Sequence, residues 1–560
     1  MPLMHNLARM EAMAAGRAQP LTTVRHRHLS QHPLVLVPLT TAGEVGAPLG
    51  AMLGTDRDRP LLLTVPQPKD RDLRFAFLSD LAEALLPHLE SALEETEQVR
   101  EDAEVCTDAP QLLVPNAPGA EFVRLLGRSM RFRRTAEEDP QTPYPSPARV
   151  PLLGRWLTHY GERARVPGSS LLLSMTEVLT RHWATGQSSL EDQHLGALLA
   201  WLRAGPEGGG EAAALEAETA RDEHGQLRTP PSGPSTDPAF DNRVLAPAVE
   251  RYDAGLPGSA EQVHQLLGGQ LRPVWDAMWE SVDLLRRLPE GERVASRWES
   301  DRWSYTAHRD RLRAGEPPQP RRDDAVTAAR KLSVRERDQA RLRAQEALDD
   351  PLVMAERRLA GEAFVAEVTD SWMTYSQGRR PMPRPVLALS TEDVPQWAPG
   401  ARAYRVLPSG AAQPAEFLAP EDGLAEGTAA AGEDDSAAES TAEGTAGPGE
   451  LRLRLTGGMG RAKEPAPGSV PEVGDRVCWT LFEHAPRGGP SLPEPEDTPW
   501  THGGPPQSGT PLPEPRTGER SGAGGSLGAG GHTVGAGSPG VTDPLAHSTL
   551  PDPVTAEDLL

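Results

Sequence analysis

The chain has 560 residues, a formal net charge of −23 and an apolar content of 37%, with 57 prolines and 54 glycines. Its length predicts several domains, and its low apolar content predicts that part of the chain lies outside any hydrophobic core. So acidic a chain is excluded from non-specific binding of polyanions unless its basic side chains cluster on one surface.

Arginine supplies nearly all of the positive charge, because the only lysines are Lys69, Lys331 and Lys463. In a chain so rich in Ala, Gly and Pro, this bias indicates GC-rich codon usage, so arginine by itself is no signal for nucleic acid. Cys106 and Cys478 stand alone, which predicts neither a disulfide framework nor a CxxC metal pair. The absence of a long apolar run and of an apolar leader predicts a cytoplasmic protein without membrane spans.

The first 32 residues form a predicted N-terminal arm, with a short helix followed by a basic segment. His26, His28 and His32 lie within the stretch HRHLSQH. Imidazoles at such short spacing can converge on a metal ion, but no nearby carboxylate or cysteine completes a ligand set. We therefore interpret this segment as a solvated basic arm.

Residues 33–135 read as a small α/β domain, because three strand-like runs are followed by a helix, a strand and a second helix. The strands end in turn-like stretches such as GTDRDR. The predicted strands are 33–39, 47–53, 60–65 and 111–114, and the predicted helices are 74–97 and 120–130.

The third of these strands ends in Gln67-Pro68-Lys69 and follows Asp56 and Asp58. This order of an acid, a strand end with QxK and a helix resembles nucleases of the PD-(D/E)xK type. The resemblance implies that Asp56 or Asp58, together with Gln67, would hold Mg²⁺ while Lys69 polarises the scissile phosphate or its attacking water. The alternative is a polar turn between strand and helix. We favour the turn, because Gln is a weaker metal ligand than Glu and Pro68 removes a backbone donor.

The middle of the chain is predicted to be helical, with helices over 149–204, a flexible linker over 205–238 and a helical stalk domain over 239–361. Residues 321–350 form a long, mostly polar helix with a thin apolar stripe. Such a helix is largely solvated or packs in a narrow coiled-coil-like seam, for which 292–313 is the candidate partner.

The pattern changes to a period of two after residue 361, where six short runs predict an antiparallel β-barrel over 362–485. An acidic low-complexity insert, 420–449, interrupts it, and a tail rich in Pro and Gly, 486–560, is predicted to be disordered. The predicted fold class is therefore multidomain α+β. The candidate strands are 362–369, 385–390, 403–407, 415–418, 451–456 and 475–482.

The barrel is also a weak candidate for nucleic-acid binding. Arg452 and Arg454 alternate with leucines and so share the outward face, and Arg402 and Arg405 are expected nearby. Charges over the barrel nearly balance, which favours an ordinary solvated face. The stalk and barrel resemble, in architecture only, accessory domains inserted into some nucleic-acid helicases.

The tail repeats a short motif in which Leu-Pro precedes an acid and a second proline. Proline favours an extended conformation that docks into a groove at low entropic cost, and three copies would act by avidity. A Pro-rich spacer is the other interpretation. The copies contain Leu492, Pro493, Leu512, Pro513, Leu550 and Pro551.

Other catalytic motifs carry little weight. A GxSxG match at 524–528 lies in the Gly-rich tail, without the strand and helix that such a nucleophile needs. No GxxxxGK[ST] occurs, so the chain holds no P-loop. The favoured hypothesis is a non-enzymatic adaptor or accessory subunit that binds a protein partner without a cofactor. The nuclease and nucleic-acid-binding hypotheses are the alternatives.

Overall fold

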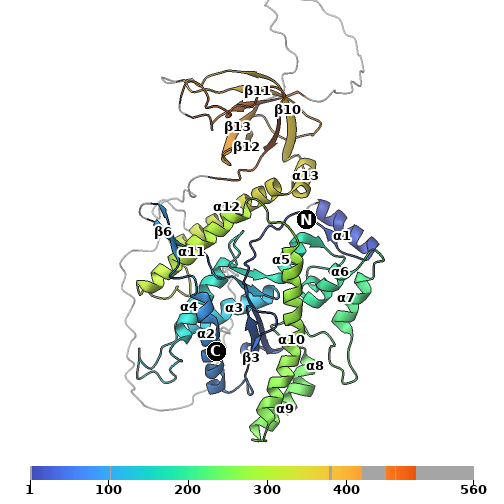
Figure 1. Cartoon of the computed structure of the whole chain (residues 1–560), viewed down its shortest axis with the longest axis vertical. Coiled ribbons are helices and arrows are strands. Elements are labelled where there is room, and N and C mark those ends of the chain that lie inside the picture. Colours follow the sequence, from blue (N-terminus) through green and yellow to red (C-terminus); the bar gives the residue numbers. More distant parts are fainter. Residues whose placement is uncertain are drawn as a thin grey trace, which may run out of the picture.

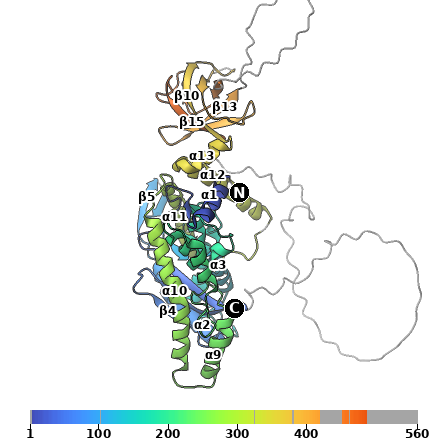
Figure 2. The ribbon, with the colours of Figure 1, turned by 90° about the vertical axis from the view of Figure 1, so that its right-hand side faces the viewer.

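The computed structural model describes residues 3–100, 103–323, 325–377, 381–418, 450–460 and 462–486. A three-layer body carries a β-barrel at one end, and the helices α12 and α13 join the two parts (Figure 1). Figure 2 shows the same order along the long axis. The predicted multidomain α+β class is confirmed. No helix in the described ranges has both the length and the apolarity to cross a membrane.

The body is built on a five-stranded sheet with the order β4-β3-β2-β7-β8. The first three strands form an antiparallel meander, and β7 and β8 add to it in parallel. Consecutive side chains of the central strand β2 are buried from Leu34 to Thr40, so both faces of the sheet must be covered. The strands are β2 (Leu34–Thr41), β3 (Glu44–Gly54), β4 (Leu61–Thr64), β7 (Leu112–Val114) and β8 (Leu172–Ser174).

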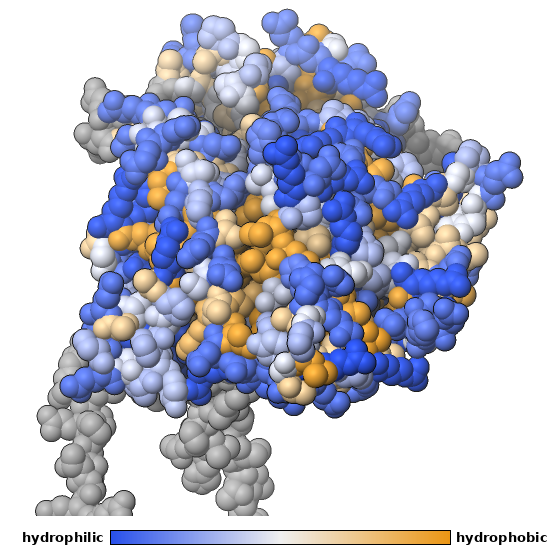
Figure 3. All heavy atoms as spheres, turned by 60° about the horizontal axis from the view of Figure 1, so that its bottom comes forward, coloured by the Kyte–Doolittle hydropathy of each residue, from blue (hydrophilic) through white to orange (hydrophobic). Residues whose placement is uncertain are grey.

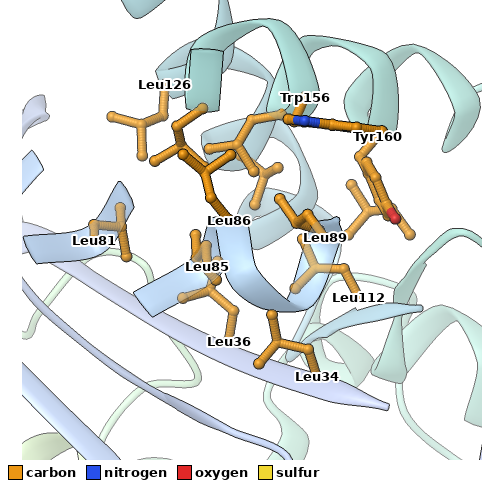
Figure 4. Close-up of a cluster of buried hydrophobic side chains, with 14 of the residues drawn as sticks. Leu34, Leu36, Leu81, Leu85, Leu86, Leu89, Leu112, Leu126, Trp156 and Tyr160 are labelled. Atoms are coloured by element: carbon orange, nitrogen blue, oxygen red, sulfur yellow. The ribbon is translucent and has the colours of Figure 1, made fainter. Parts of the chain in front are cut away.

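One face of the sheet packs against helices that include α2, α3 and α4. Figure 4 shows this core, in which Leu34 and Leu36 of β2 meet Leu85 and Leu89 of α2 beneath Trp156. Full burial of each such leucine contributes about 1.5–3 kcal/mol. The covering helices are α2 (Arg71–Leu89), α3 (Ala117–Met130), α4 (Val150–Arg163) and α11 (Val294–Arg313).

The opposite face packs against a second group of helices around the long helix α10. Val35 and Val37 of β2 contribute to this core together with Trp275, Met278 and other buried side chains of α10. The helices on this side are α1 (Leu3–Ala15), α5 (Met175–His182), α6 (Leu195–Arg203), α7 (Gly210–Thr219), α8 (Pro238–Phe240), α9 (Ala246–Asp253) and α10 (Ser259–Arg286). A two-stranded ribbon of β1 (Gln19–Pro20) and β9 (Trp183–Ala184) lies on the same side. Short 3₁₀ and π turns occur at Glu191–Gln193 and Asp241–Leu245.

Two local predictions differ from the structure. The helix predicted over 74–97 ends at Leu89, and the hairpin of β5 (Thr96–Arg100) and β6 (Ala103–Cys106) follows. Glu94 and Glu95 disfavour a continued helix, because acidic side chains oppose the dipole at a helix C-terminus. The apolar run at 171–173 was predicted as helix but supplies β8, since a short buried parallel strand has no periodicity that distinguishes it.

The segment predicted as a flexible linker, 205–238, holds α7 and then runs against the sheet. Ser232 and Thr236 are buried, and Ser235 pairs with Thr40 at the end of β2. The two cores of the body combine side chains from four of the predicted segments, 1–32, 33–135, 149–204 and 239–361.

The stalk consists of α12 (Ala325–Asp349) and α13 (Pro351–Leu359) alone. The helices α9, α10 and α11, which the predicted stalk domain 239–361 also included, pack into the two cores of the body, because their apolar side chains are buried there. Asp350 separates them and caps α13 by accepting a hydrogen bond from the Leu352 N–H at 2.9 Å. The same carboxylate accepts from the Thr23 N–H at 2.6 Å, which ties the stalk to the N-terminal arm.

The predicted antiparallel barrel is confirmed, and it is closed in the order β10-β11-β14-β13-β12-β15. All six predicted strands occur, and their inward side chains, such as Phe364, Leu453 and Trp479, are completely buried. The acidic insert and residues 487–560 of the tail lie outside the described residues. The strands are β10 (Ala363–Trp372), β11 (Val386–Ser390), β12 (Arg402–Val406), β13 (Ala412–Leu418), β14 (Glu450–Leu455) and β15 (Arg476–Thr480).

Candidate functional site

The residues of the nuclease hypothesis lie at opposite ends of β4. Asp56 and Asp58 stand in the turn before this strand, where the Asp58 N–H donates to Asp56 Oδ1 at 2.9 Å. Gln67 and Lys69 follow the strand, and the Gln67 amide donates to the Asp253 carboxylate at 2.8 Å. The structure therefore does not bring the acids to the lysine. Among the described residues, no group of three or more His, Cys, Asp or Glu side chains is arranged to hold a metal ion.

Open α/β sheets bind ligands at the carboxyl ends of the strands where the strand order reverses. Here that point lies between β2 and β7, and the chain itself fills it. The Thr40 N–H donates to the Pro234 carbonyl at 2.7 Å, and the Thr236 N–H donates back to the Thr40 carbonyl at 3.1 Å. Asn116 Nδ2 donates to the Gly233 carbonyl at 2.8 Å. The usual ligand crevice of this sheet type is therefore occupied by residues 233–236.

The three histidines of the N-terminal arm do not converge. The His26 ring lies 3.6 Å from the Asp350 carboxylate, whereas the His28 ring stacks on Trp298 with centroids 4.1 Å apart. His32 is exposed. His26 and His28 serve as packing groups between the arm and the helices, so the expectation of a wholly solvated arm holds only for His32.

The arginines of the barrel hypothesis occupy different environments. Arg452 and Arg454 alternate with the buried Leu453 and Leu455, as the period predicts. Arg454 pairs with Glu416 at 2.7 Å. Arg405 is buried, and its Nε donates to Gln413 at 2.5 Å, so it does not share a face with the exposed Arg402. The leucines and prolines of the tail motif, like the GxSxG match, lie outside the described residues.

A much denser group of arginines lies elsewhere, along α3, α4 and α12. These helices belong to the same region of the body, with α3 and α4 below α12 in the view of Figure 1. Three hollows follow one another along them, and we call this surface the basic face.

The first hollow of the basic face has a volume of about 540 Å³ and lies between the end of α3, the start of α4 and residues 315–318. Arg155 Nη2 donates to the Glu316 carbonyl at 2.7 Å, which attaches this segment to α4. The exposed ring of Phe132 also lines the hollow. Its charged residues are Arg131, Arg133, Arg134, Arg155, Glu138 and Glu316.

The second hollow shares Arg131 with the first and continues toward α12, with a volume of about 280 Å³. Arg131 donates to the Gln319 and Pro320 carbonyls and so holds the chain segment before α12 against α3. Arg335 of α12 pairs with Glu162 of α4 at 3.2 Å. The charged residues are Arg124, Arg128, Arg131, Arg165, Arg321, Lys331, Arg335, Glu162 and Asp323.

The third hollow lies one helical turn further along α12, with a volume of about 240 Å³. Its floor rests on Asp301 of α11, a completely buried carboxylate. Asp301 accepts from Arg163 at 2.5 Å, from Ser169 Oγ at 2.7 Å and from the Ser170 N–H at 2.6 Å. The charged lining residues are Arg163, Arg297, Arg337, Arg341 and Asp338.

Together the three hollows are lined by fourteen basic and five acidic side chains. This excess of positive charge is concentrated on one surface of a chain whose net charge is −23. An acidic protein can attract a polyanion only if its basic side chains cluster on one surface, and those of the basic face do so.

Several of these arginines are both crowded and incompletely bonded. Burial, together with the neighbouring Arg71 and Arg74, lowers the pKa of Arg133, and burial also lowers the pKa of Arg297. An anion bound near these side chains would raise the pKa of each, because negative charge favours the charged guanidinium. Buried Nε donors without a hydrogen-bond partner in the described part of the chain belong to Arg133, Arg155, Arg163, Arg297 and Arg341.

Glycines set the spacing of the helices that carry the basic face. A Cβ atom on Gly127 of α3 would lie 2.5 Å from the Thr158 nitrogen, and one on Gly154 of α4 would lie 2.4 Å from the Arg131 nitrogen. The two backbones therefore touch, which is possible only without side chains at these positions. This contact brings the arginines of α3 beside those of α4.

Sequence reasoning missed the basic face because arginine was attributed to codon usage. One signal was present, since Arg124, Arg128 and Arg131 recur at helical spacing before Arg133 and Arg134. No family model, no curated protein and no solved structure matches this chain.

Proposed function

We propose that the protein is a nucleic-acid-binding accessory protein that holds a phosphate backbone along the basic face. The observation that carries the proposal is the concentration of fourteen basic side chains in three successive hollows. This moves the nucleic-acid hypothesis from the barrel, where Arg405 is buried and Arg454 is paired, to α3, α4 and α12.

The composition of the basic face supports phosphate as the ligand. Arginine presents donors in a planar fork that matches phosphate oxygens, and thirteen of the fourteen basic groups are arginines. Successive hollows suit a ligand with regularly repeated charges, because each hollow can take part of the same backbone. A single small anion would need only one of them.

Ion pairs neutralise part of the charge of the basic face, since Arg124 pairs with Glu121, Arg134 with Asp139 and Arg163 with the buried Asp301, but a positive excess remains. Two further pairs are open to exchange. Arg335 pairs with Glu162 and Lys331 with Asp323, at 3.2 and 2.7 Å. These pairs are partly exposed, so each contributes little to stability and a phosphate can replace the carboxylate.

The test is the salt dependence of binding of a fluorescent oligonucleotide of about 16 nucleotides, measured by anisotropy with the full chain. The double variant Arg165→Ala/Lys331→Ala removes two partly exposed cations from the basic face, and a double variant of Arg57→Ala/Arg272→Ala removes two from elsewhere. Arg165, Arg57 and Arg272 have equally exposed side chains, each at 47%.

Each phosphate contact contributes about 0.7 to the slope of log K against log salt for a single strand, so the basic-face variant should lower that slope by about 1.4. At about 0.1 M salt the affinity should fall about 25-fold. The control should stay within about 2-fold of the wild type. Equal effects of the two double variants, or no binding by the wild type at low salt, would refute the proposal.

A protein-binding adaptor is the second candidate, and a specific surface supports it. Leu3, Leu7 and Met10 recur at helical spacing on α1 and are 63%, 49% and 66% exposed. Exposed apolar stripes of this kind are typical of protein contacts. Hydrophobic side chains also gather near the centre of the face in Figure 3, among a mainly hydrophilic surface. A pull-down with Leu7→Glu that still retains every partner of the wild type would contradict an adaptor role for α1.

A further inference from the structure

An aromatic ring stands within the basic face, in the first hollow. Phe132 directly follows the last turn of α3 and is 39% exposed. The guanidinium carbons of Arg131 and Arg321 lie 4.7 and 5.5 Å from its ring centroid. The ring is therefore held by two cations while part of it faces the hollow.

An exposed phenylalanine beside so many arginines calls for a ligand with its own apolar, planar surface. Covering the part of Phe132 that is still exposed would gain free energy of burial, and the phosphate backbone alone cannot cover it. A nucleobase can, because base faces stack on aromatic rings irrespective of sequence. The volume of about 540 Å³ lies within the range of small-molecule sites, so a nucleotide fits.

Paired and unpaired nucleic acids differ in what they offer to this ring. In a duplex the base faces are stacked on one another, and only base edges and backbone are accessible. A single strand exposes base faces next to its phosphates. The combination of a ring with flanking arginines therefore favours an unpaired strand.

We propose that the basic face selects single-stranded nucleic acid, with one base stacked on Phe132 and the adjacent phosphates held by the arginines of the first and second hollows. This inference rests on the proposed function, since it specifies the ligand class of the same surface.

The experiment measures the affinities of the full chain for a single-stranded DNA, a single-stranded RNA and a DNA duplex, each with about 16 nucleotides per strand. It compares the wild type with Phe132→Leu and Phe132→Trp. Leucine keeps an apolar side chain without a stacking face, whereas tryptophan keeps the face. The matched control is Trp372→Leu, because Trp372 is 38% exposed and lies 5.6 Å from the Arg452 guanidinium on the barrel.

The expected result is tighter binding of the single strands than of the duplex. Phe132→Leu should lower single-strand affinity about 5- to 150-fold, leave duplex affinity within about 2-fold, and be rescued by Phe132→Trp. Trp372→Leu should have no such effect. The two single-strand arms decide whether DNA or RNA is preferred.

Two failures can be told apart. If the wild type binds single strands and duplex equally and Phe132→Leu changes neither, the selection of single strands is overturned while the proposed function stands. If the wild type binds neither, both are overturned. A loss in Phe132→Leu that tryptophan does not rescue, or that is equal for the duplex, also overturns the stacking role. A loss in Trp372→Leu instead would assign the contact to the barrel.

Discussion

The backbone contact between α3 and α4 holds the basic face together, and Gly154→Ala tests it. A Cβ atom at this position would lie 2.4 Å from the Arg131 nitrogen and 2.7 Å from the Met130 carbonyl carbon. Ordinary contacts of a Cβ atom begin at 3.4 Å, so the two helices must separate by roughly 1 Å. Neither contacting atom belongs to a flexible side chain that could move aside.

The expected cost follows from two opposing terms. Forcing a methyl group into a packed contact costs about 1–3 kcal/mol, and a rigid backbone partner places this case at the upper end. Alanine in a helix is favoured over glycine by about 1 kcal/mol. The free energy of unfolding of the body should therefore fall by about 2 kcal/mol.

The assay is urea denaturation followed by tryptophan fluorescence, since Trp156 and Trp298 lie in the affected core. Gly269→Ala in α10 is the matched control, because a Cβ atom there meets nothing within 4 Å. The control should gain up to about 1 kcal/mol, so the two variants should differ by about 3 kcal/mol. The same preparations should show weaker oligonucleotide binding for Gly154→Ala only, because Arg131 lines two hollows.

Equal stability of the two alanine variants would refute the reasoning, since it would mean that α3 and α4 do not approach as closely as their glycines allow. A large loss of stability with unchanged oligonucleotide affinity would retain the packing argument and contradict the dependence of the basic face on it.

Three further predictions concern buried polar groups. Asp301→Ala should destabilise the body by about 3–5 kcal/mol in urea denaturation, because it removes a completely buried carboxylate and leaves the largely buried Arg163 guanidinium without its charged partner. Asp276→Ala is the control, because its partner Arg272 and Asp276 itself are 47% and 42% exposed, so the loss should stay under about 1 kcal/mol. Burial lowers the pKa of His308 to about 3 from its ordinary 6.5, so the unfolded chain binds the proton first as the pH falls. Stability that is present above pH 6.5 should therefore be lost progressively as the pH falls toward 3. His308→Gln should flatten this part of the profile of stability against pH and His32→Gln should not, whereas a flat wild-type profile would be inconsistent with a buried neutral ring. Asn116→Ala should lower the melting temperature, because it removes both the N-cap of α3 and the hydrogen bond that anchors residues 233–236 in the sheet crevice. The free energy of unfolding should fall by about 2 kcal/mol. An unchanged melting temperature would argue against that anchoring.

Local patterns in the sequence determined most of the secondary structure and the barrel. A period of two, with short turns between runs, identified all six strands from 363 to 480, because each side chain in a barrel strand faces either the core or the solvent. Helical spacing likewise identified α3 and α12. These features depend on neighbours within a few residues, so the sequence displays them directly.

Only the tertiary structure decided which pieces share a core and where the charges gather. The strand β8 lies in a run too short and too uniformly apolar to be distinguished from helix, and its place beside β7 depends on a partner about 60 residues earlier. The basic face joins Arg131, Arg163, Arg297 and Arg335, which come from four separate elements. Conversely, Gln67 and Lys69 are close in sequence to two acids that the strand between them keeps apart. A site is a juxtaposition in space, and no local pattern encodes the close approach of two helices that Gly127 and Gly154 permit.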